Sequence, residues 1–282
     1  MATNQNLNRT MTLIPAISTV VGTVIGAGVF YKASSVADAT GSTSMSLFVW
    51  LVGGLISLAA GLTGAELAAA LPQTGGMLVY IERAYGKLAS YVLGWAQIII
   101  YFPASLAAKG IIFGTQVANL FHWGYVAIIP SGIAALVSVA AINMLGSKIA
   151  GQFQSITLFF KLIPLALIII FGLLQPGGVD VSIFPVTPGH AVGGWASAMG
   201  AGLLATMYAY DGWIHVGNIA GEMKNPTRDL PRAIAGGLLG IMVIYLLVNY
   251  AFLHALPFSA IQGNANTAMD AAQQIFGSFG GK

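Results

Sequence analysis

The chain has 282 residues, of which 57% are hydrophobic and only 7% are charged, with a mean hydropathy of +0.82 and a formal net charge of +3. A soluble domain carries about 25% charged residues, so this composition cannot cover a water-facing surface and indicates a lipid bilayer as the solvent. The absence of cysteine excludes disulfides, thiolate metal sites and cysteine nucleophiles. No basic run interleaved with aromatic residues suggests a nucleic-acid partner.

Seven apolar stretches are each long enough to cross a bilayer, which takes about 20 residues in a helix. They cover residues 12–37, 45–71, 88–121, 125–145, 153–174, 195–223 and 233–256. An eighth helix is expected to begin near Thr267, and the sequence stops within it at Lys282. We therefore expect a single all-α transmembrane domain over residues 1–282, in a chain that is a fragment or a truncated reading frame.

Lysine and arginine concentrate in the cytoplasmic loops of membrane proteins, and their positions here predict an orientation. They lie before the first stretch and in every second connection, as Arg9, Arg83, Lys87, Lys148, Lys224, Arg228 and Arg232. The alternate connections contain neither residue type. We expect a multi-pass protein of the cell membrane with a cytoplasmic N-terminus. Asn225-Pro226 and the two arginines that follow are interpreted as helix termination and anchoring.

The first apolar stretch contains GTVIGAGVF at residues 22–30, in which three of the nine residues are glycine. Glycine costs about 1 kcal/mol relative to alanine in a helix interior. Gly22 and Gly26 have the GxxxG spacing of a helix–helix contact. Gly28 lies on a different face, which favours a break in the helix. The backbone groups freed by a break are tolerated at membrane depth only where they are buried in protein or line a cavity.

The sixth stretch holds a second candidate break, because Asp211 and Gly212 fall near its middle. A carboxylate at the bilayer centre costs about 3 kcal/mol or more. We interpret Asp211 as the N-cap of a second half-helix, with a role as substrate ligand or proton carrier as the alternative. Breaks five spans apart are typical of inverted-repeat transporters, which bind substrate between them. An amino acid suits such a site, since its carboxylate meets free N–H groups and its ammonium meets free carbonyls.

Four segments together carry a resemblance to a known family: GTVIGAGVF (22–30), AELAAALPQTGGMLVYIERAYGKLASYVLGW (65–95), LFFKLIP (158–164) and YAYDGWIHVGNIAGEMKNPTRDLPRAI (208–234). The chain resembles the amino acid–polyamine–organocation (APC) superfamily, in its L-amino-acid transporter branch, and within that branch the bacterial serine/threonine exchangers. The resemblance implies a LeuT-like fold with two inverted repeats of five spans, of which spans one and six are broken. Residues 12–174 would form the first repeat and residues 195–282 the start of the second, with the C-terminal spans missing.

The resemblance also implies a substrate site at the two breaks. The substrate carboxylate would meet backbone N–H groups of Gly26, Ala27 and Gly28. The ammonium would meet carbonyls near Val24, Tyr208 and Asp211. Ile25 and Ala209 are also expected among the substrate-binding residues. Tyr208 occupies the position of an aromatic that often closes over the substrate, whereas Tyr210 and Trp213 are interpreted as packing residues.

Lys161 interrupts the apolar sequence SITLFFKLIPLALIII, about 12 Å along the helix from the cytoplasmic end of span five. Snorkelling toward the membrane surface is one interpretation. The resemblance implies another, because sodium-independent relatives have a lysine where sodium-coupled ones bind a cation. The hypothesis is that Lys161 replaces the driving ion. Lys32, in the second half of span one, is expected to extend toward the outer interface.

The predicted function is therefore sodium-independent exchange of small neutral L-amino acids such as serine and threonine, with no cofactor. One alternative is a proton- or sodium-coupled symporter on the same fold, and another is a membrane fragment that does not transport. An intramembrane enzyme built on Asp211 and His215 is disfavoured, because no nucleophile or metal set joins them. The expected partners are the amino acid substrates and the lipid bilayer, and nothing in the sequence indicates whether an accessory subunit takes part.

Overall fold

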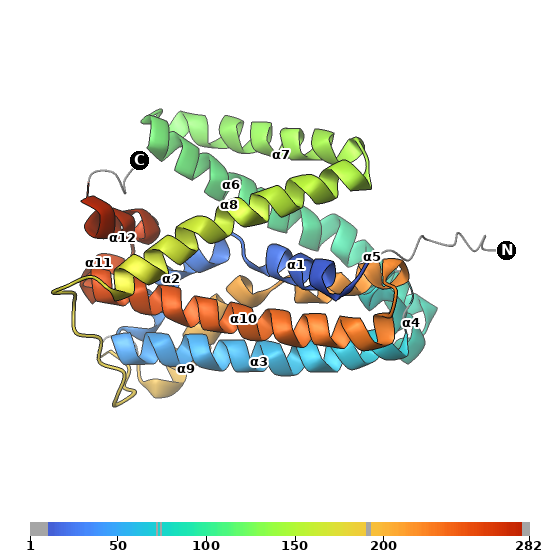
Figure 1. Cartoon of the computed structure of the whole chain (residues 1–282), viewed down its shortest axis with the longest axis horizontal. Helices are drawn as coiled ribbons and strands as arrows, with labels where there is room; N and C mark the ends of the chain where they lie inside the picture. The colour runs from blue at the N-terminus through green and yellow to red at the C-terminus, as the bar shows by residue number, and fades with distance from the viewer. Residues whose placement is uncertain (1–10, 72, 74, 190–192, 278–282) are drawn as a thin grey trace. The chain divides into compact units, whose positions relative to one another are not determined.

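The computed structural model is built of helices joined mostly by short connections (Figure 1). It describes residues 11–71, 73, 75–189 and 193–277, apart from the side chains of residues 147, 148, 150, 151, 218 and 219. Arg9, Lys282 and the side chain of Lys148 therefore lie outside the described part of the chain. The expected all-α membrane class is confirmed.

The helices of the first half of the chain are α1 (Leu13–Val24), α2 (Gly28–Thr40), α3 (Thr43–Ala70), α4 (Met77–Tyr85), α5 (Lys87–Ala96), the π-helix η1 (Gln97–Tyr101), α6 (Phe102–Phe121), the 3-10 helix η2 (Tyr125–Ala127) and α7 (Ile128–Met144). Those of the second half are α8 (Ser147–Leu173), α9 (Trp195–Tyr210), the 3-10 helix η3 (Trp213–Glu222), α10 (Pro226–Ala255), α11 (Phe258–Ile261) and α12 (Thr267–Phe276).

Five helical stretches of the described residues are long and apolar enough to cross a membrane: Thr43–Ala70, Lys87–Phe121, Tyr125–Met144, Gln152–Leu173 and Pro226–Ala255. A sixth is the pair α1 and α2, which is bent by 46° at the predicted first break. The remaining expected span, 195–223, is divided into the 16-residue α9 and the 3-10 helix η3. Both predicted interruptions are therefore present.

One predicted boundary is wrong, because α10 begins at Pro226 and not near residue 233. Asn225-Pro226 is the start of a helix rather than its termination. Proline at the first helical position sacrifices no hydrogen bond, since that N–H has no partner inside the helix. Asp229 adds a carboxylate to the first turn, where the helix dipole favours it, and pairs with Arg228 at 2.7 Å.

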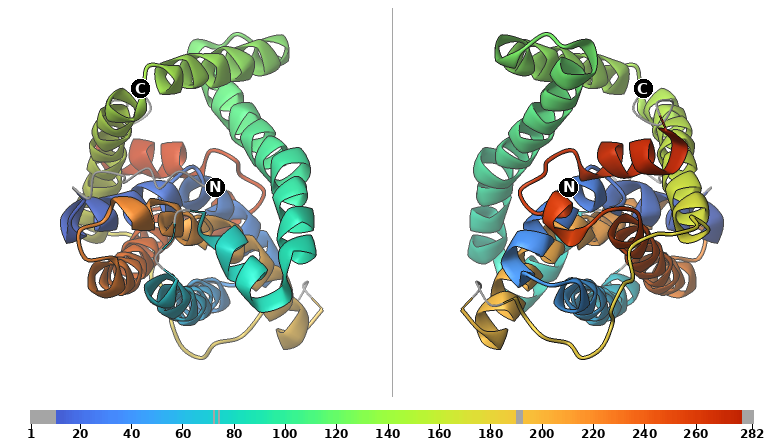
Figure 2. Two further views of the ribbon diagram at one scale, coloured as in Figure 1. Left: turned by 90° about the vertical axis from the view of Figure 1, so that its right-hand side faces the viewer. Right: turned by 90° about the vertical axis from the view of Figure 1, so that its left-hand side faces the viewer.

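Contacts between residues divide the chain into two compact units, one comprising residues up to Met77 together with Phe160 onward, and the other Leu78–Phe159. In the first unit, α3 and α10 lie side by side along much of their length (Figures 1 and 2). Glycines on α3 permit this approach, because a Cβ on Gly61 would collide with Leu238 and one on Gly54 would lie 2.5 Å from Met242. Small residues at a helix interface are the usual means of close packing inside a bilayer.

The second unit contains α5, α6 and α7, and α6 packs against α7 through glycines as well. A Cβ on Gly110 would lie 2.9 Å from Leu136, and one on Gly114 or Gly132 would collide with the backbone of the other helix. The turn between them places His122 at φ 54° and Gly124 at φ 75°. These two left-handed residues reverse the direction of the chain between α6 and α7.

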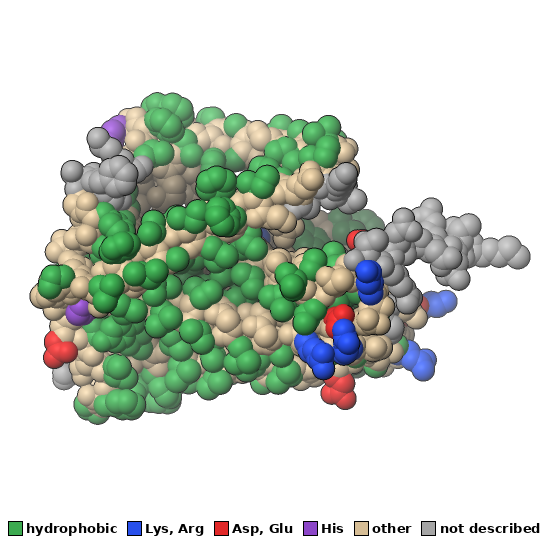
Figure 3. All heavy atoms as spheres, in the orientation of Figure 1, with side chains coloured by type: hydrophobic (Ala, Val, Ile, Leu, Met, Phe, Trp, Pro, Cys, Tyr) green, Lys and Arg blue, Asp and Glu red, His purple; other side chains and the backbone are tan. Residues whose placement is uncertain are grey.

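The chain entering α1 and the chain leaving η3 are joined by a two-bond backbone bridge. The Met11 N–H donates to the Glu222 carbonyl at 3.0 Å, and the Lys224 N–H donates to the Met11 carbonyl at 2.9 Å. In the view of Figure 3, most lysine and arginine side chains gather at the end where α10 begins, whereas hydrophobic side chains cover the face along α3 and α10.

Candidate functional site

The first break separates α1 from α2 by three non-helical residues, Ile25 to Ala27. Ile25 ends α1 with an extended conformation (φ −71°, ψ 97°), which turns the chain away from the helix axis. Ala27 is the N-cap of α2 and supplies no side-chain hydrogen bond to the helix. Because the first N–H groups of a helix have no acceptor within it, α2 presents donors where α1 presents carbonyl acceptors.

The second break separates α9 from η3 by Asp211 and Gly212. Asp211 is extended (φ −68°, ψ 151°) and is the C-cap of α9, whereas Gly212 is the N-cap of η3. The prediction that Asp211 is the N-cap is therefore wrong by one residue. The reason is that the capping position has φ 117°, a conformation that glycine adopts readily and aspartate does not.

The two breaks pack against each other in a reciprocal way. A Cβ on Gly28, at the start of α2, would lie 3.0 Å from the Cα of Ala209, near the end of α9. A Cβ on Gly212, before η3, would lie 2.9 Å from the carbonyl oxygen of Thr23, near the end of α1. In each case the glycine that precedes or begins the second half-helix of one broken span allows close approach to the C-terminal end of the first half-helix of the other span. Gly26 makes no such contact, since the nearest atom to its Cβ position is a carbonyl oxygen 4.0 Å away.

A tyrosine that sequence reasoning did not identify connects the two breaks. The hydroxyl of Tyr245, from the middle of α10, lies 3.1 Å from the carbonyl oxygen of Val24 and 3.0 Å from that of Ala209. Tyr245 is fully buried. Its single proton serves both acceptors, and each carbonyl keeps a second lone pair for another donor. The sequence does contain one indication of this role: Tyr245 lies within an apolar membrane helix, where a buried phenol hydroxyl needs a hydrogen-bond partner.

The predicted packing roles of Tyr210 and Trp213 agree with their contacts. Tyr210 is buried, donates to the Trp50 carbonyl at 3.1 Å, and lies 5.0 Å from the Tyr245 ring centroid to centroid. Trp213 packs against α3, where a Cβ on Gly64 would lie 2.7 Å from the indole. The aromatic cluster of Trp50, Tyr210 and Tyr245 therefore supports both breaks from one side.

Lys161 reaches the first break from α8. Its Nζ atom lies 3.4 Å from the carbonyl oxygen of Ile25, which is the C-cap residue of α1. The side chain is half-buried. A cation at this position is favourable because the C-terminal end of a helix carries partial negative charge.

A cavity of about 590 Å³ lies beside the second break. Small-molecule sites commonly have about 300–1,000 Å³. Tyr208 and Asp211 line this cavity, together with Lys32 of α2, the packed residues Tyr210 and Trp213, and further residues of α3 and α9. The Nζ atom of Lys32, a residue expected to extend toward the outer interface, lies 4.8 Å from the centroid of the Tyr208 ring. Residues 24–28, predicted to bind the substrate, do not line this cavity; Val24, Ile25 and Gly28 are buried, Gly26 is half-buried and Ala27 is exposed.

The described residues contain no group of three or more histidine, aspartate or glutamate side chains that could hold a metal ion. His215 lies within η3, after the break, and does not line the cavity. The site therefore offers backbone donors and acceptors, one carboxylate and two lysines. These groups suit the binding of a small zwitterion.

Comparisons with known proteins identify the family to which the chain is similar. Residues 11–282 match the family described as "Amino acid permease". The serine/threonine exchanger SteT of Bacillus subtilis (strain 168) is 44% identical over 286 residues, which cover 100% of this chain and 64% of that protein. The b(0,+)-type amino acid transporter 1 of Mus musculus is 30% identical, with 92% of this chain and 54% of that protein covered. The cystine/glutamate transporter of Homo sapiens is 29% identical, with 97% and 55% covered. The chain thus spans less than two thirds of each of these relatives.

Proposed function

The chain belongs to the amino acid permease family, and on this basis we propose that the protein is a secondary carrier that exchanges small neutral L-amino acids, such as serine and threonine, across the cell membrane. The observation that carries the proposal is the pair of helix breaks in contact with each other. The 44% identity to a serine/threonine exchanger supports the choice of substrates. The N-terminus is proposed to be cytoplasmic, from the alternation of lysine and arginine between the connections.

The proposed site binds the substrate through its main-chain groups. The carboxylate accepts from the N–H groups of Gly26, Ala27 and Gly28 at the start of α2, where the helix dipole favours an anion. The ammonium donates to carbonyls of Val24, Ile25, Tyr208, Ala209 and Asp211. This assignment is supported by the second lone pair that remains on the Val24 and Ala209 carbonyls beside the Tyr245 hydroxyl.

Lys161 is proposed to supply the charge that a coupling ion supplies in related symporters. Its ammonium lies 3.4 Å from the Ile25 carbonyl and is held there as a fixed cation. We expect transport by the full-length protein to be independent of sodium and to be lost in Lys161→Ala. Full activity of that variant would remove the hypothesis, and stimulation of uptake by sodium would favour a coupled symporter instead.

The experiment that tests exchange is counterflow in liposomes containing the full-length protein. Labelled serine should accumulate in vesicles preloaded with unlabelled serine or threonine, and should not accumulate in empty vesicles. Equal uptake into empty vesicles would contradict obligatory exchange. The absence of any uptake, from folded protein, would favour a chain that does not transport.

A further inference from the structure

The cavity at the second break is lined by two side chains of opposite charge. Asp211 contributes a carboxylate from the break itself, and Lys32 contributes an ammonium from α2. The other residues that line the cavity are uncharged, so its formal charge sums to zero. A neutral cavity is what a carrier of neutral amino acids requires.

The backbone packing of the two broken spans accounts for the position of Lys32. Gly28 allows α2 to approach the end of α9 at Ala209. Lys32 follows Gly28 by four residues, about one helical turn, and thus lies on the same face of α2. Tyr208 precedes Ala209, and its ring receives the Lys32 ammonium at 4.8 Å. A cation is attracted to the face of an aromatic ring, and the attraction is larger where water is excluded.

The carboxylate of Asp211 would by itself attract a substrate with a cationic side chain. Opposite charges at close range inside a protein interact much more strongly than in water, because the effective dielectric constant is lower. Lys32 opposes this attraction in two ways: its charge offsets that of Asp211, and its ammonium already occupies the face of Tyr208. Tyr208 alone would otherwise be open to a lysine or arginine side chain, since it is 37% exposed.

We propose that Lys32 is a specificity-determining residue, which excludes amino acids with cationic side chains from the cavity that Asp211 and Tyr208 line. This inference rests on the proposed function, because it assumes that the cavity receives the side chain of an amino acid. It assigns a role in selecting substrates to a residue outside the backbone binding segments.

The test compares labelled lysine with labelled serine in counterflow by the full-length protein and its variants. Lys32→Met keeps the length of the side chain and removes its charge, and should raise the lysine-to-serine uptake ratio roughly tenfold, a change equivalent to about 1.4 kcal/mol. Lys32→Arg retains the charge and should keep the wild-type ratio. The ratio should also be unchanged in Lys224→Met, which removes an exposed cation that does not line the cavity. Adding Asp211→Asn to Lys32→Met should abolish the gain.

Two outcomes would overturn the inference: an unchanged ratio in Lys32→Met, or equal changes in Lys32→Met and Lys32→Arg, which would indicate packing and not charge. These outcomes are distinct from a failure of the proposed function, which is tested by serine counterflow of the wild-type protein alone. Ligand-induced thermal stabilisation of the purified variants gives a second readout that needs no transport. Lysine should stabilise Lys32→Met more than wild type, and equal stabilisation would again contradict the proposal.

Discussion

Replacing Gly212 by alanine tests whether the contact between the two breaks is essential to the fold. Gly212 has φ 117°, and holding a residue with a side chain in such a sparsely populated region costs about 1–3 kcal/mol. The added Cβ would also lie 2.9 Å from the Thr23 carbonyl oxygen, a backbone atom that moves only if α1 moves. Overpacking of this kind costs a further 1–3 kcal/mol, roughly.

The two contributions sum to roughly 2–6 kcal/mol, a large part of the about 5–15 kcal/mol that stabilises a typical protein. We therefore expect Gly212→Ala to lower the melting temperature of the detergent-solubilised protein by roughly 5 °C or more, and to impair serine counterflow. Melting is followed by the fraction of protein that remains monodisperse in size-exclusion chromatography after heating.

Gly236→Ala in α10 is the matched control. This glycine is exposed, its φ is not positive, and a Cβ there would have no atom within 4 Å. Alanine in a helix interior gains about 0.5–1 kcal/mol over glycine, so the control should be neutral or slightly more stable. If Gly212→Ala melts and transports as Gly236→Ala does, the argument that Gly212 is required by its backbone conformation and by Thr23 is refuted.

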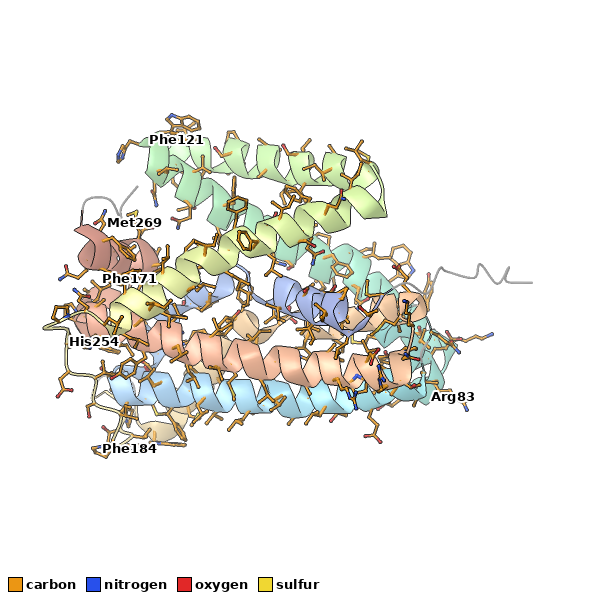
Figure 4. The ribbon with its side chains drawn as sticks, in the orientation of Figure 1. Arg83, Phe121, Phe171, Phe184, His254 and Met269 are labelled. Carbon is orange, nitrogen blue, oxygen red and sulfur yellow. The ribbon has the colours of Figure 1, made fainter. Side chains whose placement is uncertain are left out.

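Three further predictions concern other parts of the chain. Tyr245→Phe keeps the ring but removes the donor to the Val24 and Ala209 carbonyls, so the melting temperature should fall by the equivalent of about 1–3 kcal/mol; melting at the wild-type temperature would show that the hydroxyl contributes nothing. Gly114→Ala would place a Cβ against the backbone of α7 and should lower the melting temperature by a similar amount in the same assay. Gly236→Ala is again the control, and equal melting of the two variants would contradict the prediction. Both ring nitrogens of His254 face carbonyl oxygens, at 2.9 Å from Val179 and 3.3 Å from Gln175 (Figure 4). Replacing His254 by leucine removes both ring contacts and keeps an apolar side chain in their place. Hydrogen exchange of the Val179 amide, which donates to the His254 carbonyl at 2.7 Å, should therefore be faster in His254→Leu than in wild type, and an equal rate would show that the ring does not hold this connection.

The positions of both breaks were predictable because their signals are local. Glycines at 22, 26 and 28, and an aspartate followed by glycine at 211, are unusual inside apolar stretches, and each lowers helix stability where it stands. Lys161 is also a local signal, because it is a charged residue inside an apolar stretch. The predicted start of α10 is wrong because charged residues beside an apolar stretch indicate a loop, whereas Pro226 and Asp229 also suit the first turn of a helix.

The roles of Tyr245 and Lys32 were not predictable, because each depends on partners distant in sequence. Tyr245 is 221 residues from Val24, to which it is hydrogen-bonded. Periodicity places it on a helix but does not say which backbone carbonyls reach it. Lys32 contacts Tyr208 only because Gly28 brings α2 against α9, and the packing of two half-helices is not encoded in either stretch alone.

The backbone bridge between Met11 and Met223 has a consequence for the order in which the chain is assembled during synthesis. The residues it joins are about 200 positions apart, and ribosomes add about 5–20 residues per second, so roughly 10–40 s pass between their appearance. During that interval the carbonyl of Val24 also lacks Tyr245. The first span is therefore synthesised well before its partners at Glu222, Lys224 and Tyr245, and α1 can form these hydrogen bonds only after α10 has been synthesised.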